Sequence, residues 1–322
     1  MSKKKNQHYV SQFYLKNWSI DGQKVYAYLK KPIFMNTKEI ASENYFYRIQ
    51  SINSPTRNIL LKLLAKLKSP LISGLLKDTI DSLYIVDLLG KKSDNKQLKD
   101  EEAKFKTNAV ENIYSIIEEC AAVDIGTILN NNIKTFDINN YQNVLRYATY
   151  QLVRTQKGRD RFKTDASDEL YEKDIDFQTY HTFQSLILAE KLTLSLIERL
   201  YKITLLNNDT DINFITNDNP AINLNKIEDF DVKLYLPLSP RKAIIVENSG
   251  IKDEDAQHIK NLILSDKEYD KYFINERTSS IDEVHSLNKI MWNYKHRSVY
   301  AITADEINVY AKNQDAVNNK KL

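Results

Sequence analysis

The sequence predicts an α+β fold, in which segments from both ends of the chain build a small mixed sheet around a large inserted helical block. Six glycines and six prolines in 322 residues favour long helices over an all-β sandwich. Apolar residues recur at helical spacing through the middle of the chain, whereas short alternating stretches lie towards both ends. With 42% hydrophobic residues, a chain of this length can bury a sizeable core.

The N-terminal part, residues 1–55, is expected to supply a short helix and strands to the sheet. The stretch "NQHYVSQFYLKNW" (6–18) predicts the short helix, with Ser11 as a candidate N-cap. Residues 24–31, "KVYAYLKK", alternate in the manner of a strand, and Pro32 ends it. A further short strand and a loop complete this part. If strand 24–31 joins the C-terminal sheet, the opening segment is held against the core.

A helical block is expected over residues 56–207, because apolar residues recur there at i, i+3 and i+4. Its first helical stretch should break at Pro70 and stop at Gly90. Charged residues dominate 91–102, which predicts a flexible loop. Three further helices are expected near 101–122, 138–164 and 167–206.

The C-terminal part, residues 208–322, predicts an α+β segment. Its β-rich stretches "INFITNDNPAINL", "VKLYLPLSP" and "KAIIVEN" are separated by Asn, Asp and Pro turns. Helices are expected around 253–265 and 281–295, then a strand at "RSVYAIT" and a helical tail from residue 303. The three parts should form one composite globular unit.

Composition narrows the class of protein. The net charge of +3 creates no strong field, and no apolar run approaches the roughly 20 residues that span a bilayer. No apolar segment follows Lys3–Lys5, so a secretory signal is not expected. The single cysteine, Cys120, excludes an internal disulfide and lies in an apolar helical pattern typical of the core. We expect a cytoplasmic protein with no membrane partner and leave its oligomeric state open.

The stretch "FITNDNPA" (214–221) is the first candidate site. A strand leads into Asp218 and Asn219, and Pro220 favours an extended exit from the turn. Asp218 could hold a divalent metal such as Mg²⁺, accept a proton or orient an imidazole. The alternative is an Asx-type turn, in which these side chains satisfy local backbone groups.

A basic stripe is the second candidate site. Arg154, Lys157 and Arg161 are spaced i, i+3 and i+7 and would share one face of a helix. Such a stripe could bind phosphate, with arginine supplying bidentate donors. A solvated helix face is the alternative.

Histidines offer the third candidate site. His8 and Gln12 would stack on one side of a helix that covered both, unless Ser11 caps that helix and leaves His8 outside it. His285 and Asn288 repeat this logic at i, i+3. Histidine is the side chain most easily poised near neutral pH, although a hydrogen-bonded structural role is the alternative.

Several standard motifs are missing or weak. There is no HxxxH, HExxH or CxxC spacing for zinc, no GxSxG elbow, and no glycine-rich phosphate loop of a nucleotide cofactor. Asp218 with Asp231 and Lys233 loosely matches the D…DxK triplet of metal-dependent nucleases.

Four segments together resemble the bacterial family Domain of Unknown Function 4238. "NQHYVSQFYLKNW" is similar to the family's "QHYVPQFYLRNF", "FITNDNPA" to "FxTSDNP", "LPLSP" to "LPLSP", and "LNKIMWNYKHRSVYA" to its C-terminal stretch. This chain has Ser11 where the family usually has proline and Asn217 where it has serine. The resemblance spans nearly the whole chain and implies a stand-alone bacterial cytoplasmic protein, in some cases near phage-defence genes. The polar positions it matches are His8, Gln12, Arg154, Asp218, Asn219, Ser239 and Asn288.

We expect from these residues a defence-type effector, a nuclease that cleaves RNA or DNA. His8 would be a general acid or base, Asp218 would orient it or hold the metal, and Arg154 would stabilise phosphate charge. Substrate-positioning roles would fall to Gln12, Asn219, Asn288, Ser239, Lys157 and Arg161. Two alternatives stay open: a non-catalytic sensor or interaction module with a partner protein in a phage-defence or toxin–antitoxin system, and an enzyme acting on a nucleotide or NAD.

Overall fold

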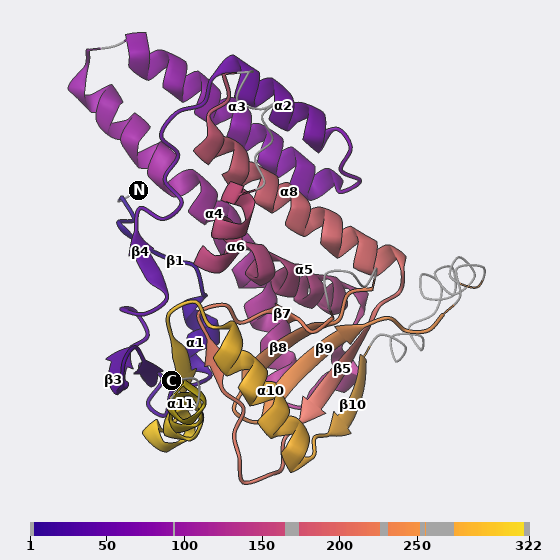
Figure 1. Cartoon of the computed structure of the whole chain (residues 1–322). Helices are drawn as coiled ribbons and strands as arrows, with labels where there is room; N and C mark the ends of the chain where they lie inside the picture. The colour runs from indigo at the N-terminus through magenta and orange to yellow at the C-terminus, as the bar shows by residue number, and fades with distance from the viewer. Residues whose placement is uncertain are drawn as a thin grey trace.

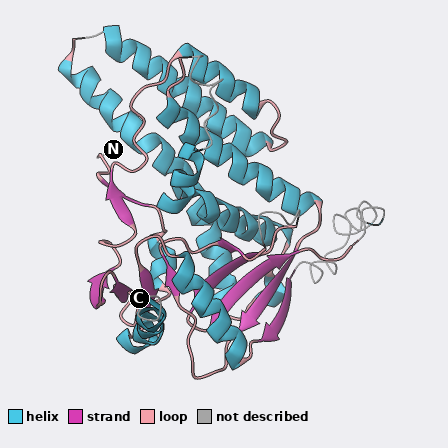
Figure 2. Ribbon diagram, in the orientation of Figure 1, coloured by secondary structure: helices cyan, strands magenta, loops and turns pink. Residues whose placement is uncertain are grey.

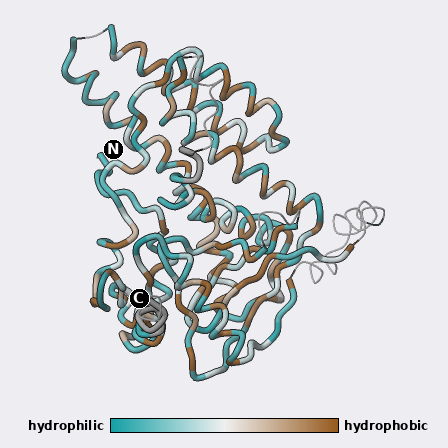
Figure 3. Tube along the Cα trace, viewed as in Figure 1, coloured by the Kyte–Doolittle hydropathy of each residue, from teal (hydrophilic) through white to brown (hydrophobic). Residues whose placement is uncertain are grey.

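The computed structural model describes residues 3–92, 94–164, 174–225, 231–251, 255 and 274–318. Its fold class is α+β, as the sequence predicts. Long helices gather at one end of the molecule and the strands at the other (Figures 1 and 2). Apolar residues run along the strands of the larger sheet and along the helices (Figure 3).

Strands from both ends of the chain meet in a four-stranded sheet of order β3-β2-β11-β6. β2 (Lys24–Tyr28) and β3 (Pro32–Asn36) come from the N-terminal part, whereas β6 (Thr216–Asn217) and β11 (Val299–Ala301) come from the C-terminal part. Tyr300 of β11 pairs in antiparallel register with Ala27 on one side and Thr216 on the other. The expectation that the two ends of the chain share a sheet is therefore confirmed.

A five-stranded mixed sheet has the order β10-β5-β9-β8-β7. Its strands are β5 (Lys202–Asn207), β7 (Ile222–Asn223), β8 (Leu234–Ser239), β9 (Lys242–Glu247) and β10 (Ile274–Thr278). β10 runs parallel to β5, and the other pairs are antiparallel. The first five residues of β8 and of β9 are buried, as expected where both faces of a sheet are covered. The predicted helix over 167–206 is wrong at its C-terminal end, because β5 begins at residue 202.

The N-terminal segment is held by strand pairing to another part of the chain and is not frayed. β1 (Asn6–His8) pairs antiparallel with β4 (Ser42–Asn44). The helix α1 (Gln12–Lys16) follows. The side chains of Tyr14, within α1, and of Trp18, just after it, are fully buried. A five-residue helix is too short to be stable alone, so tertiary packing stabilises it.

The longer helices of the block carry apolar faces, as their spacing predicts. The block consists of α2 (Ser54–Leu64), α3 (Pro70–Lys92), α4 (Lys96–Leu129), the short 3₁₀ helix η1 (Ile133–Thr135), α5 (Ile138–Arg154), α6 (Gln156–Thr164) and α8 (Phe177–Glu198). Near the C-terminus lie α10 (Ile281–Tyr294) and α11 (Ala304–Asn318). Of the two C-terminal helices expected, that at 281–295 corresponds to α10, whereas that at 253–265 falls almost wholly outside the described residues.

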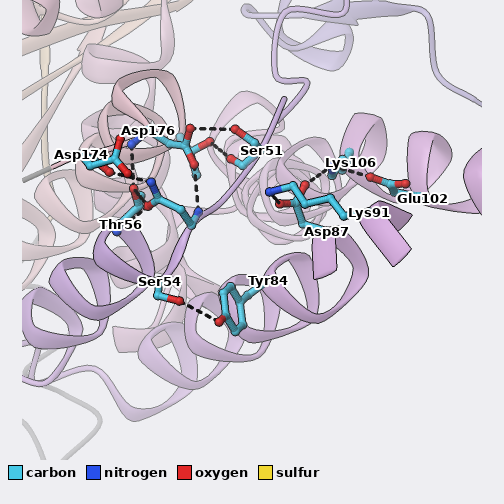
Figure 4. A network of polar contacts seen from close by, with 12 residues as sticks. Ser51, Ser54, Thr56, Tyr84, Asp87, Lys91, Glu102, Lys106, Asp174 and Asp176 are labelled. Carbon is cyan, nitrogen blue, oxygen red and sulfur yellow. Dashed lines mark hydrogen bonds and ion pairs between the residues drawn. The ribbon is translucent and has the colours of Figure 1, made fainter. Parts of the chain in front are cut away.

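The helices α3 and α4 extend into the predicted loop over 91–102, which is wrong for most of that range. Pro70 begins α3, where a missing N–H costs nothing. The predicted helix stop at Gly90 is wrong, because α3 continues to Lys92. A Cβ atom at Gly90 would meet the carboxylate of Glu102, so α3 and α4 approach closely here. The same close approach lets Lys106 bind both Asp87 and Glu102 (Figure 4).

A second polar cluster joins the start of α2 to the segment before α8. Asp176 accepts hydrogen bonds from Ser51 Oγ at 2.7 Å and from the backbone N–H of Asn53 at 2.9 Å (Figure 4). Asn53 caps α2 by accepting the N–H of Thr56 at 2.9 Å. These bonds fix how α2 and α8 sit beside each other.

Two further expectations concern single features. Cys120 is exposed, so its predicted place in the core is wrong. It lies on the solvent side of α4, whose buried residues include Ile117 and Ala121. No helix in the described parts of the chain has the length and apolar character to cross a membrane.

Candidate functional site

A pocket of about 460 Å³ lies where β1, α1 and α4 approach the end of α5. We call it the His8 pocket; it is lined by Asn6, His8, Gln12, Lys38, Glu111, Tyr114, Ser115, Glu118 and Arg154. α4 contributes four of these residues at i, i+3, i+4 and i+7, the spacing of one helix face. Three residues that the sequence singles out, His8, Gln12 and Arg154, therefore meet in one pocket.

Among the side chains that line this pocket, His8 is the one whose ordinary pKa lies nearest to neutral pH. It is the last residue of β1, so it lies outside α1, in agreement with the alternative in which Ser11 precedes the helix. Its Nε2 atom nevertheless lies 3.2 Å from Nε2 of Gln12. Burial lowers the pKa of His8 and outweighs hydrogen bonding to the backbone of Thr37, which raises it. The imidazole is thus mainly neutral at neutral pH, which suits a general base.

Arg154 forms the inner wall of the His8 pocket and is only 3% exposed. Its Nε donates to Tyr47 Oη at 3.0 Å, its Nη2 donates to the carbonyl of His8 at 2.6 Å, and its Nη1 pairs with Glu118. Its guanidinium also lies 4.3 Å from the ring centre of Tyr114. Burial acts to lower the pKa of Arg154, but Tyr47 and Glu118 carry it above its usual value. All three guanidinium nitrogens already donate to groups of the protein, so Arg154 holds the wall of the pocket in place.

Glu111 carries a half-buried carboxyl on the same face of α4. Its Oε2 atom is buried and accepts no hydrogen bond from the described residues, and Lys4 Nζ lies 4.0 Å from its Oε1. Burial raises the pKa of Glu111, while Lys4 partly offsets the rise. A larger fraction of this carboxyl stays protonated than in an exposed glutamate, which suits a general acid.

Sequence reasoning missed the contribution of α4 to the site. Glu111, Ser115 and Glu118 stand out only as polar residues that share one face of a helix with Tyr114. That stripe was the available signal. Burying polar side chains without partners costs free energy, so a polar stripe on a packed helix indicates a face that lines a pocket. Lys38, in the loop between β3 and β4, carries no sequence signal.

Asp218 is not among the residues that line the His8 pocket. Its carboxylate accepts the backbone N–H groups of three consecutive residues, His296 at 2.8 Å, Arg297 at 2.7 Å and Ser298 at 3.1 Å. It is 1% exposed, and burial raises the pKa of Asp218 despite these three donors. The geometry is that of an anchor for the turn between α10 and β11.

The predicted nuclease triplet is not assembled around Asp218. Asp231 accepts a hydrogen bond from Tyr201 Oη, and Lys233 pairs with Glu247 at 2.9 Å. Across the described ranges, no three His, Cys, Asp or Glu side chains are grouped to hold a metal ion. These residues therefore offer no geometric support for a metal site.

Asn219 lies in an Asx-type turn, the alternative that the sequence left open for this stretch. The side chain of Asn217 accepts the N–H of Asn219 at 2.7 Å and donates to the carbonyl of Met291 at 2.6 Å. Asn219 in turn accepts the hydroxyl of Thr155 at 2.6 Å. These buried bonds connect the strand region to α10 and to the end of α5.

Asn288 and Ser239 also satisfy backbone groups. Asn288 is fully buried, accepts the N–H of Ile215 at 2.9 Å and donates to the carbonyl of Asn213 at 2.8 Å. Ser239 Oγ accepts the N–H of Arg241 at 3.3 Å in the turn between β8 and β9. Neither residue lines the His8 pocket.

The predicted basic stripe is wrong, because the helix that would carry it is interrupted. α5 ends at Arg154, Thr155 is extended, and α6 begins at Gln156. Gly158 permits this break, since a Cβ atom there would lie 2.5 Å from a backbone oxygen of α5. Lys157 donates to the carbonyl of Tyr294 at 3.0 Å and lies over its ring. The side chain of Arg161 lies outside the described part of the structure.

A comparison with known families matches residues 6–305 to the family described as "Protein of unknown function (DUF4238)". The match covers nearly the whole chain, so the chain belongs to this family, and the resemblance seen in the sequence is confirmed. No curated protein and no solved structure matches the chain. Any function must therefore be argued from the site itself.

Proposed function

We propose that this member of the family is a hydrolase that cleaves phosphodiester bonds of RNA or DNA in the His8 pocket. One observation carries the proposal: an imidazole whose pKa is lowered and a carboxyl whose pKa is raised, those of His8 and Glu111, line one partly open pocket. Shifts in these directions favour a neutral imidazole and a protonated carboxyl at the same pH.

His8 would take the proton from the attacking hydroxyl, either water or a ribose 2′-hydroxyl. Glu111 would give its proton to the leaving oxygen, so the proton count balances over the reaction. The Gln12 Nε2 atom donates to His8 Nε2 at 3.2 Å and so orients the imidazole; the attacking hydroxyl would displace this donor when His8 takes its proton. Lys38, which is exposed at the pocket, would attract the phosphate.

This assignment changes two roles expected from the sequence. Asp218 would act only by anchoring its turn, because both carboxylate oxygens accept backbone N–H groups. Arg154 would position His8 and Glu118 instead of binding phosphate directly. The expected setting, a defence effector in the bacterial cytoplasm, rests on the family resemblance alone and is part of the proposal.

The test incubates the purified chain with labelled RNA and DNA oligonucleotides, in EDTA and separately with Mg²⁺. We expect cleavage that His8→Ala and Glu111→Gln each reduce by at least about 100-fold, the usual scale of a lost general acid or base. His285→Ala is the matched control. His285 does not line the pocket, so this variant should cleave the oligonucleotides as the wild type does. Intact oligonucleotides under every condition would refute the proposal.

A non-catalytic sensor or interaction module is the second candidate. It is favoured by the bonding of Arg154, Asp218 and Asn288, whose polar groups bind other parts of the chain in buried positions. On that reading, His8→Ala lowers the melting temperature by several degrees and no reaction is found. The remaining alternative, an enzyme that acts on a nucleotide or NAD, is tested by chromatography of those compounds after incubation with the same variants.

A further inference from the structure

A second pocket, of about 560 Å³, lies at the edge of the five-stranded sheet where β5 and β10 end and β9 begins. We call it the Lys242 pocket; it is lined by Asn131, Asn207, Asn208, Asp209, Thr210, Asp211, Arg241, Lys242 and Thr278. It shares no residue with the His8 pocket. Thirteen residues separate Glu118 from Asn131 along and beyond α4, which corresponds to roughly 20 Å at the rise of a helix.

Lys242 is the buried cation of this pocket, at 8% exposure. Its Nζ atom donates to the side-chain oxygens of Asn131 at 2.7 Å and Asn207 at 2.9 Å. No carboxylate among the described residues forms an ion pair with it. Burial lowers the pKa of Lys242, and the more distant Glu276 and Asp209 offset this only in part. A buried ammonium held by two neutral amides is costly unless an anion completes its shell.

The surrounding backbone is shaped to form the pocket. Asn131 has a φ of 60°, in the left-handed region that asparagine tolerates better than most residues. Asn208 is buried, accepts the N–H of Thr210 at 3.1 Å and donates to the carbonyl of Ile212 at 2.7 Å. Arg241 donates from Nη1 alone to carbonyls of this loop, so its Nε and Nη2 atoms have no partner within the described residues.

Acidic groups complement the two cations. Asp209 and Asp211 line the pocket and are exposed. Within the part of the chain that the structure describes, neither carboxylate takes part in a hydrogen bond or an ion pair. The pocket therefore presents uncommitted donors on Lys242 and Arg241 together with two uncommitted carboxylates.

We infer that the Lys242 pocket binds a small zwitterion, an α-amino acid or a compound with the same pair of charges. Its carboxylate binds Lys242 and Arg241, and its ammonium group binds Asp209 or Asp211. Two carboxylates at the pocket repel a polyanion, so this site is distinct from a phosphodiester site and does not depend on the proposed function.

Isothermal titration of the full chain with each of the twenty L-amino acids tests the inference. Acetate and methylamine serve as probes of each charge alone, and inorganic phosphate serves as a probe of a simple anion. We expect saturable binding of at least one amino acid, and binding at least about tenfold weaker for each single-charge probe, as the loss of one charge-assisted contact predicts.

Variants locate the binding. Lys242→Met should weaken it about tenfold or more, and so should the double substitution Asp209→Asn with Asp211→Asn, which removes both candidate partners of the ammonium group. Arg241→Gln, at an exposed position, provides a second test if Lys242→Met fails to fold. Lys202→Met is the matched control. Lys202 lies on the same sheet outside the pocket, so this variant should bind the amino acid as the wild type does.

Two results with the wild-type protein would overturn the inference. One is the absence of saturable binding by every amino acid. The other is acetate or phosphate binding as tightly as the best amino acid, which would leave a simple anion site. Unchanged binding by folded Lys242→Met and Arg241→Gln variants would likewise remove this pocket as the site.

Discussion

The Nη2 atom of Arg154 donates a 2.6 Å hydrogen bond to the backbone carbonyl of His8, across 146 residues of sequence. The bond joins the end of α5 to β1. It holds the imidazole in the pocket that Glu111 and Glu118 of α4 also line. The His8 pocket therefore exists only when the N-terminal strand docks against the helical block.

Replacing Arg154 with methionine should destabilise the fold by about 3–5 kcal/mol, because Glu118 and the carbonyl of His8 lose a buried partner. Urea denaturation measures this change in the free energy of unfolding. Arg277→Met is the matched control: Arg277 pairs with Glu283 at an exposed site, and its loss should cost about 0–1 kcal/mol. Equal effects of the two substitutions would contradict the bracing role.

Asp218→Asn should lower the free energy of unfolding by about 1–3 kcal/mol. The amide keeps one acceptor oxygen, but its NH₂ group must face a backbone N–H that the carboxylate now accepts. Asn225→Ala is the comparison and should cost less, because among the described residues its side chain makes one partly buried hydrogen bond, to the carbonyl of Asp231. Thermal melts of both variants decide the matter, and a neutral Asp218→Asn substitution would show that the turn does not need this anchor.

His8 should make stability depend on pH in the mildly acidic range. Because burial lowers the pKa of His8 in the folded state, the unfolded chain binds more protons between that pKa and 6.5. The contribution of His8 to stability is thus present above pH 6.5 and is lost as the pH falls through this window. His8→Gln should flatten that part of the curve relative to the wild type in urea titrations at several pH values, and an unchanged curve would contradict the prediction.

Two glycine substitutions should act in opposite directions. Gly158→Ala places a Cβ atom 2.5 Å from the carbonyl oxygen of Val153, so it should cost about 1–3 kcal/mol. Gly126→Ala lies inside α4 with no atom within 4 Å of the new Cβ, and it should gain up to about 1 kcal/mol. Thermal melts compare them, and stabilisation by Gly158→Ala would contradict the tight turn between α5 and α6.

The fold class followed from local patterns, but several element boundaries did not. Apolar spacing located the helical block, and the alternation at 24–31 located β2. Thr155 looked like an ordinary helical residue, because no local pattern shows that Gly158 lies so close to Val153, the approach that permits the break. The strand β5 was missed because its partners, β9 and β10, lie about 40 and about 70 positions later in the chain.

The site divides in the same way. The sequence by itself identified His8, Gln12 and Arg154 as candidate site residues, the first two in a segment that resembles a family motif and the third in a run of basic residues. Only the tertiary structure decided that Glu111 joins them and that Asp218 anchors a distant turn instead. The physical reason is range: helix and strand patterns depend on neighbours within a few residues, whereas hydrogen bonding and burial depend on which distant segments pack together.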